Sequence, residues 1–293
     1  MYSDYKTYLI LFGGVFALST SAIFVKIADA PSAIIAFYRL LIAGAVLVPF
    51  CLLSSKSRFE ITAFQRRQWR QIISAGFFLA LHYVMWFESL TFTSIASSTM
   101  LVSMQPLFSL GLDRFVQRRT ITKTALTGCI VALIGCIVIG AGDFRISGDS
   151  LFGDILAFAA AGVIALYFFV GETVRKDVSA LTYSVLSYLI SAVILAVYCV
   201  VRAESFSGYT DKTWLAFIGL ALIATIGGQF VFNLLLKKVS ASVVTMSILG
   251  EPIGTCILAY LLLNEGIMLQ QFVGIVIIML GMTIFFSRPT YLK

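Results

Sequence analysis

Two apolar stretches each carry a polar residue followed directly by proline, a combination that could bind a solute or a proton inside a membrane. Residues 240–264 contain Glu251 and Pro252, and residues 94–112 contain Gln105 and Pro106. A carboxylate at membrane depth costs about 2.5–3.5 kcal/mol on insertion scales, so it normally faces a cavity or a partner rather than lipid. Proline removes a backbone donor at the same level and loosens the helix. These positions are therefore the first candidates for a binding site.

Glu251 has two possible roles. On a continuous helix it would share one face with Ser247 and Thr255, because residues four apart are neighbours on a helix. The matching face of the earlier stretch would carry Gln105 and Ser109. Such a face could hold a ligand or a proton, or it could form internal hydrogen bonds that fix helix packing, which is a normal use of polar residues in membranes. Both roles stay open on the sequence.

The composition indicates an all-α membrane protein with many spans. The 293 residues are 60% hydrophobic and 12% charged, whereas a soluble domain is about 45–50% apolar and about 25% charged. Ten apolar segments approach the roughly 20 residues that a spanning helix needs. They cover residues 8–27, 32–53, 71–90, 94–112, 124–141, 151–171, 180–201, 213–236, 240–263 and 268–287.

The basic residues predict the orientation of these ten helices. In this arrangement 16 of the 21 Lys and Arg residues fall on the side of the termini and 4 fall on the other side, while Arg39 lies inside a helix. Cytoplasmic loops are enriched in Lys and Arg. We therefore expect a multi-pass protein of the cell (inner) membrane with both termini in the cytoplasm. The net charge of +7 is assigned to orientation, so no nucleic-acid partner is expected.

A shift of 146 residues superimposes the two halves of the chain. It places Pro106 on Pro252, and it also matches Ser94 with Ser240, Thr99 with Thr245, Gly128 with Gly274 and Gly135 with Gly281. The division is then 1–145 and 146–293, with five helices in each half. Because five is odd, the second half enters the membrane from the opposite side. Inverted repeats of this kind are typical of secondary transporters, which bind substrate near the midplane between the halves.

Helix three carries a second group of candidates. His82 and Trp86 lie on one face, and Tyr83 and Phe87 lie on another. His82 titrates near physiological pH and could couple a proton, although a lone buried histidine is more often a structural hydrogen bonder. The aromatic rings could bind a cation, or they could simply pack. Tyr167 in helix six is a further candidate for the cavity wall.

The 146-residue shift sends Tyr83 to Gln229 and Phe87 to Asn233. Gln229 and Asn233 lie four residues apart on helix eight, so their amides could hydrogen-bond a substrate together. Bonds to neighbouring helices are the alternative. Two-fold pseudosymmetry also predicts that Gln105 and Glu251 face one central cavity.

Charged residues near the outer side could gate the site. Arg39 lies about seven residues inside helix two and is expected to pair with Glu88, because a charge in the membrane needs a partner. Binding of an anionic substrate group is the alternative role for Arg39. Lys26 and Glu265 lie near helix ends and could snorkel or gate the outer mouth. Helices five and ten carry glycines at seven-residue spacing, which predicts close helix packing and a scaffold role.

No motif indicates an enzyme, a metal site or a cofactor. The sequence lacks G-x-x-x-x-G-K-[ST], so ATP is not the direct energy source. A single histidine and the absence of G-x-S-x-G leave no catalytic constellation. The five cysteines form no C-x-x-C pair, so neither a zinc site nor a disulfide framework is indicated. The expected partners are a small-molecule solute and the lipid bilayer. A monomer is favoured, with a dimer as the alternative.

The chain resembles the EamA-type drug/metabolite transporter family over almost its whole length. The resemblance is carried by Ser19-Thr20-Ser21, Lys26, Pro31, residues 37–41, Ala96-Ser97-Ser98, Gln105-Pro106, Gly153-Asp154, Ser240-Ala241-Ser242, Glu251-Pro252 and Asn264-Glu265. It implies a ten-helix inverted-repeat carrier that moves small organic solutes by alternating access. The family spans exporters of amino acids and drugs and importers of metabolites. Export of amino acids is the leading expectation, with uptake of a nutrient or a quaternary amine as the alternative.

Overall fold

The computed structural model describes residues 2–140, 148–263 and 268–287, and over these ranges the regular structure is helical. In chain order the helices are α1 (Tyr2–Ile27), α2 (Ser32–Leu53), α3 (Ser55–Ala63), α4 (Arg66–Phe92), α5 (Ile95–Val102), α6 (Gln105–Phe115), α7 (Lys123–Gly140), α8 (Gly148–Val174), α9 (Ala180–Val201), α10 (Asp211–Gly219), the π-helix η1 (Leu220–Phe230), α11 (Val231–Leu235), α12 (Ala241–Ile248), α13 (Glu251–Leu263) and α14 (Leu269–Phe286).

The predicted fold class is confirmed as an all-helical membrane protein. Within the described ranges, eight helical runs are long and apolar enough to cross a membrane, and α7 is apolar but slightly shorter. Helices α2 and α9 have the predicted bounds. The short helix α3 was not expected; it is polar and mostly exposed, and the side chain of Ser54 caps its start by accepting from the Ser57 amide.

Two of the expected helices are interrupted at corresponding places. The fourth segment forms α5 and α6, which are separated at Ser103 and Met104, and the ninth forms α12 and α13, which are separated at Leu249 and Gly250. Proline in the first turn of each second half explains the breaks, because it cannot continue a helix that runs through from the N-terminal side. The continuous face predicted for Ser247 and Glu251 is therefore wrong, since these residues belong to different helices.

The eighth segment is continuous but changes its winding. It runs through α10, η1 and α11, and its central part is a π-helix. The Thr225 hydroxyl donates to the Leu220 carbonyl five residues earlier, at 2.9 Å, which fits π-type winding. Such segments are rare and occur frequently at functional sites.

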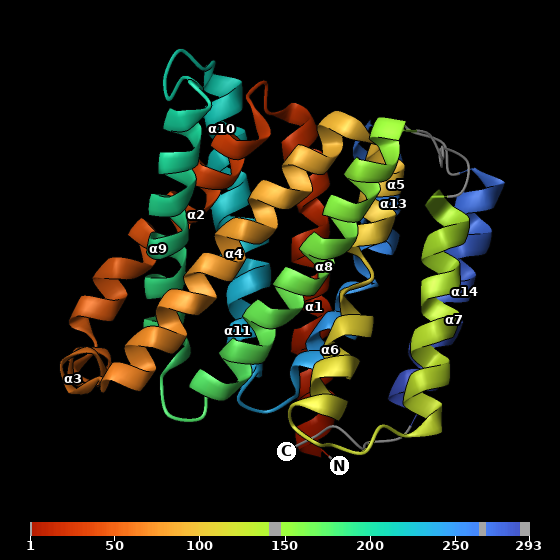
Figure 1. The fold of residues 1–293 in the computed structure, drawn as a ribbon, viewed down its shortest axis with the longest axis horizontal. Coiled ribbons are helices and arrows are strands. Elements are labelled where there is room, and N and C mark those ends of the chain that lie inside the picture. The colour runs from red at the N-terminus through yellow and green to blue at the C-terminus, as the bar shows by residue number, and fades with distance from the viewer. Residues whose placement is uncertain (1, 141–147, 264–267, 288–293) are drawn as a thin grey trace.

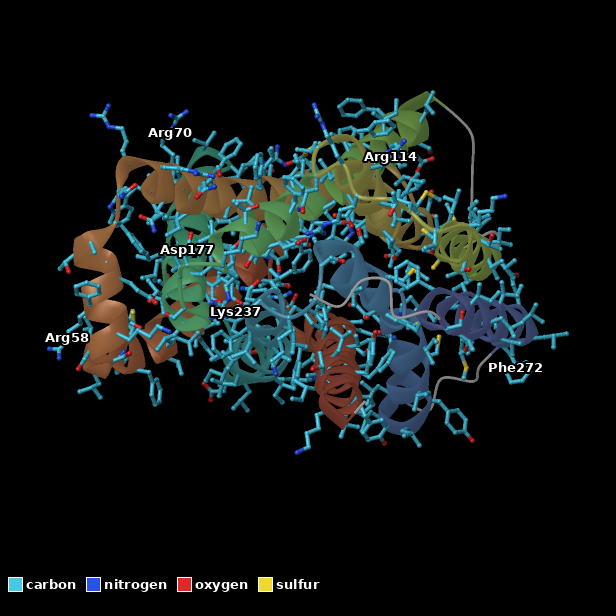
Figure 2. The ribbon with its side chains drawn as sticks, turned by 90° about the horizontal axis from the view of Figure 1, so that it is seen from below. Arg58, Arg70, Arg114, Asp177, Lys237 and Phe272 are labelled. Atoms are coloured by element: carbon cyan, nitrogen blue, oxygen red, sulfur yellow. The ribbon has the colours of Figure 1, made fainter. Side chains whose placement is uncertain are left out.

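The start of α1 and the end of α14 lie at the lower edge of the bundle in Figure 1. Helix α3, the start of α4, the end of α6 and the connection after α11 lie at the same lower edge in Figure 1. These segments carry Arg58, Arg70, Arg114 and Lys237, which are labelled in Figure 2. The second half lies beside the first, since α8 packs along α4 and α9 packs along α2 and α4. Segments from both halves thus form one bundle.

Helices α7 and α14 pack together at the right-hand side of Figure 1. Glycines at their interface allow the two backbones to touch. A Cβ atom at Gly281 would lie 2.3 Å from the amide nitrogen of Ala132, and one at Gly135 would lie 2.7 Å from the Gly274 carbonyl oxygen. The close packing predicted from the glycine spacing is confirmed. No side chain larger than hydrogen fits at these positions without separating the helices.

Alanine at Gly281 is expected to destabilise the protein by about 1–3 kcal/mol, because overpacking forces the backbones apart. Gly13 on α1 is the control, since a Cβ there would meet nothing within 4 Å. Alanine at Gly13 should be neutral or stabilise by about 0.5–1 kcal/mol through helix propensity. Thermal unfolding of the two variants in detergent measures the difference, and equal midpoints would contradict the packing argument.

Candidate functional site

Arg39 is a buried cation in the middle of α2, with only 5% of its surface exposed. Its Nε donates to the Thr225 hydroxyl at 3.1 Å and its Nη1 donates to the Ser21 hydroxyl at 3.2 Å. The guanidinium carbon lies 5.4 Å from the centre of the Tyr83 ring, which adds a cation–π contact. Neutral groups therefore hold this charge. No carboxylate of the described residues is within ion-pair distance of it.

The predicted pair of Arg39 and Glu88 is not formed. The Glu88 carboxylate accepts a hydrogen bond from the Tyr198 hydroxyl and lies 3.7 Å from the Arg202 guanidinium. The reason is helix geometry: Tyr83, which Arg39 covers, and Glu88 are five residues apart on α4, so they point about 140° apart. Glu88 faces the end of α9 instead of α2.

Glu251 opens α13, the second half of an interrupted helix, and is half-buried. It is close enough to Arg39 to interact with its charge, and Tyr83 interacts electrostatically with both. At the first turn of a helix, a carboxylate is favoured by the partial positive charge of the helix dipole. A guanidinium group from α2 and a carboxyl group from α13 are thus both near Tyr83, and no direct ion pair joins them.

Helix α1 fixes the position of this half-helix. The Ser19 hydroxyl donates to the Glu251 carbonyl at 3.1 Å, and the Thr255 hydroxyl donates to the Ser19 carbonyl at 3.2 Å. A Cβ at Gly254 would lie 2.3 Å from the Ser19 hydroxyl oxygen. Because these contacts hold the first turn of α13 against α1, the Glu251 carboxylate has a defined place.

Four of the predicted site residues have a buried side-chain polar atom with no hydrogen-bond partner in the described chain. They are Trp86 on α4, Gln105 at the start of α6, Gln229 in η1 and Asn233 on α11, through Nε1, Oε1, Nε2 and Oδ1 respectively. An unmade hydrogen bond of this kind costs about 1–3 kcal/mol. A substrate could supply acceptors to Trp86 and Gln229 and a donor to Gln105, which fits a binding role.

His82 supports the aromatic wall. Its Nδ1 donates to the Ala160 carbonyl on α8 at 3.0 Å, and its ring stacks on Trp86 with 6.1 Å between centres. Trp86 stacks in turn on Phe87 at 5.2 Å. His82 therefore fixes the position of Trp86, and its structural role is visible in these contacts.

Asn233 and Tyr167 belong to a buried hydrogen-bond network. Both are fully buried, and the Asn233 amide donates to the Tyr167 hydroxyl at 2.7 Å and to the Ser184 hydroxyl at 2.9 Å. They form a network between α8, α9 and α11, with Tyr183 stacked on Tyr167. The structure brings these two residues together with each other, and it also places Gln229 beside the Tyr167 hydroxyl.

Sequence reasoning missed three hydroxyl residues. Ser21 and Thr225 hold Arg39, and Ser19 holds Glu251. One signal was available: Thr225 precedes Gln229 by four residues on the same helix, and Ser19 and Ser21 lie in an otherwise apolar segment. Pro106 and Pro252 lie in the first turns of α6 and α13, where their lack of a donor is tolerated. Lys26 interacts with another group in the structure and is not a free cation. Glu265 lies outside the described residues.

A family model for the EamA-like transporter family matches this chain twice, over residues 5–141 and 151–287. The chain belongs to the EamA-like transporter family. The two matches cover most of both halves, which agrees with the two helix sets that form the bundle. The protein is thus a membrane protein of the EamA-like transporter family.

Curated relatives carry the same general description. The uncharacterized transporter YxxF of Bacillus subtilis is 23% identical over 282 residues, covering 96% of this chain and 87% of the relative. An uncharacterized transporter of Clostridium kluyveri is 24% identical over 208 residues, covering 68% of this chain and 66% of the relative. The match to YyaM of Bacillus subtilis also covers 66% of that protein. Two of the three matches therefore span slightly less than two thirds of the relative.

A solved crystal structure has the same fold. It aligns with a TM-score of 0.83 and 17% sequence identity, covering 96% of both chains. At this identity the likeness concerns the arrangement of helices alone. The shared fold therefore extends over nearly the whole molecule, and the chemistry must come from the residues of this chain.

Proposed function

We propose that this EamA-family protein is a secondary carrier of ten transmembrane helices that exports amino acids or related metabolites. The two inverted repeats would comprise residues 1–145 and 146–293, with both termini in the cytoplasm. One observation supports the orientation. The arginines and the lysine labelled in Figure 2 belong to segments at the end where α1 begins and α14 ends, and cytoplasmic loops are rich in such residues.

The placement of Arg39 and Glu251 carries the substrate proposal. The Arg39 guanidinium and the Glu251 carboxyl group interact electrostatically with each other and with Tyr83, and no direct ion pair joins them in the described residues. An α-amino acid carries a carboxylate and an ammonium group on the same carbon. Its carboxylate would bind Arg39, which can grip such a group with two parallel hydrogen bonds, and its ammonium group would bind Glu251.

The remaining contacts would orient the substrate. Trp86 and Gln229 would donate hydrogen bonds and Gln105 would accept one, which would pair these three buried polar atoms. The face of Trp86, held by His82, would pack on an apolar or aromatic side chain. Asn233 and Tyr167 would support this layer from below. If protons drive export, Glu251 would release its proton when the ammonium group binds, and His82 is the reserve candidate for this role.

The packing of the interrupted helices supports alternating access. Inversion makes the pair α6 and α12 equivalent to the pair α5 and α13. Helix α6 packs against α12, whereas no comparable packing joins α5 to α13 over their described residues. The site would therefore be closed at the end of the termini and accessible from the opposite end. Exchange of these two packing arrangements would move the substrate across.

Other functions have weaker support. Uptake of a quaternary amine would use Glu251 and the aromatic faces, but Arg39 already covers Tyr83 and would repel a second cation. A channel would not need opposite charges fixed around one ring. Membership in a transporter family and the lack of a catalytic motif argue against an enzyme. The lipid bilayer is the expected environment, and the helix set is expected to act as a monomer, with a dimer as the alternative.

Flux into proteoliposomes tests this proposal. Vesicles would be offered amino acids, nucleosides and quaternary amines separately, with and without a pH gradient. We expect saturable, stereoselective movement of one or more amino acids. Saturable movement of quaternary amines alone would favour the uptake carrier, and flux that rises linearly with concentration would favour a channel.

A further inference from the structure

A buried charge cluster lies at the end of the bundle where the chain begins. Arg119, in the connection after α6, donates from Nη1 to Asp113 Oδ1 at 2.8 Å and from Nη2 to Glu172 Oε1 at 2.5 Å. The side chains of Asp113 and Glu172 are 1% and 0% exposed, and that of Arg119 is 28% exposed. One arginine therefore holds two carboxylates that water barely reaches.

The second oxygen of each carboxylate accepts from the first turn of α12. Glu172 Oε2 accepts from the Ala241 amide at 2.7 Å, and Asp113 Oδ2 accepts from the Ser242 hydroxyl at 2.5 Å. Every carboxylate oxygen of the cluster thus has a partner. This pairing keeps the buried charges stable, because removal of one partner of a buried ion pair leaves an uncompensated charge.

The cluster joins elements from both halves of the chain. Asp113 and Arg119 belong to the first half, while Glu172 ends α8 and Ala241 begins α12 in the second half. It also joins the two interrupted helices, since Asp113 lies in α6 and Ser242 lies in α12. The other ends of α6 and α12 lie next to the candidate site residues Gln105 and Glu251. Figure 2 places Arg114, the neighbour of Asp113, on this end of the molecule.

The repeat gives the cluster a counterpart in sequence. The 146-residue shift maps Arg119 onto Glu265 and Glu172 onto Lys26, so the two signs are exchanged. Glu265 lies outside the described residues. In the sequence, each end thus has one basic and one acidic residue at these positions, with the signs exchanged.

We infer that Arg119, Asp113 and Glu172 form a lock that keeps the site closed at the end of the termini. Access from this end requires α6 and α12 to separate, and the cluster is what ties their facing ends together. Opening must break the bond between Asp113 and Ser242, and also one of the two bonds of Glu172, to Arg119 or to the Ala241 amide. The lock goes beyond the proposed substrate and rests only on the alternating-access part of the proposed function.

The test measures how fast a membrane-impermeant thiol reagent labels a cysteine placed in α6. Ser109 lies one turn after Gln105, between the site and the cluster, and is 2% exposed. Cysteine at this position, in a background with Cys256→Ser, reports opening when a membrane-impermeant thiol reagent is applied from the terminal side. We expect slow labelling with the lock intact and labelling at least tenfold faster with Arg119→Gln. No substrate is needed, so failure of the amino-acid proposal would leave the readout unaffected.

Three controls separate opening from unfolding. Arg114→Gln removes an exposed arginine from the same segment and should change the rate less than twofold. Ser242→Ala removes one hydrogen bond and should give a smaller rise, which keeps the test available if Arg119→Gln does not fold. The natural thiols Cys129 and Cys136 are buried on α7 and should stay unlabelled. An unchanged rate, or labelling of Cys129 and Cys136 in step with position 109, would overturn the lock.

Discussion

Replacing Glu251 with glutamine is expected to reduce substrate flux at least hundredfold and to abolish any acceleration by a pH gradient. The amide keeps the size of the side chain but cannot carry the negative charge that would bind an ammonium group or a proton. Charge-assisted hydrogen bonds contribute about 1.5–3 kcal/mol, and the loss of coupling adds to the loss of binding. Initial rates in proteoliposomes containing equal amounts of protein measure the effect.

Asp211→Asn provides the matched control for this variant. It makes the same change from carboxylate to amide on an exposed residue at the start of α10 and should leave flux within twofold of the original. Glu251→Gln should keep its fold, because the Ser19 hydroxyl donates to the backbone carbonyl of residue 251 and not to the side chain that is changed. Undiminished transport by Glu251→Gln would make Glu251 a packing residue.

Replacing Arg39 with glutamine is expected to raise KM for amino acids by about 10–100-fold, equivalent to the loss of about 1.5–3 kcal/mol from a charged hydrogen bond. Arg39→Lys should have an intermediate effect, since lysine keeps the charge but lacks the planar fork that matches a carboxylate. The corresponding amines without a carboxylate should bind Arg39→Lys as well as the original, and should bind Arg39→Gln at least as tightly, because the repelling charge is gone. Competition of each compound for flux of the transported amino acid gives these values.

Arg70→Gln is the control for the arginine series, because Arg70 is exposed at the terminal end of the molecule (Figure 2). Its KM should match that of the original protein. A uniform loss of affinity for amines and amino acids alike in Arg39→Gln would point to a structural role, in which Arg39 only holds Ser21, Thr225 and Tyr83 together.

Local rules predicted most of the fold. Length and hydropathy located the helices, and the bounds of α2 and α9 agree with the structure because polar or turn residues flank a continuous apolar run at both. Proline was predicted to loosen two helices, but sequence alone did not distinguish a loosened helix from one that stops and restarts. That distinction depends on whether neighbouring helices such as α1 can hold the new helix start.

The candidate site residues were chosen where a single residue is anomalous for its surroundings. Glu251, Gln105 and Arg39 are expensive in an apolar segment, and the repeat pointed to Gln229. The partner of Arg39 was predicted wrongly because depth in the membrane says nothing about which face of α4 turns toward α2. The cluster at Arg119 was missed for a related reason, since it joins residues that are up to 129 positions apart.

A structure with the transported amino acid bound tests the central claim most directly. We predict density between Arg39 and Glu251, with the carboxylate on the Arg39 guanidinium, the ammonium group on Glu251 and the side chain against Trp86. The polar atoms of Trp86, Gln105 and Gln229 that lack partners here should then have them. Density elsewhere, with Arg39 still bound only by Ser21 and Thr225, would contradict the account.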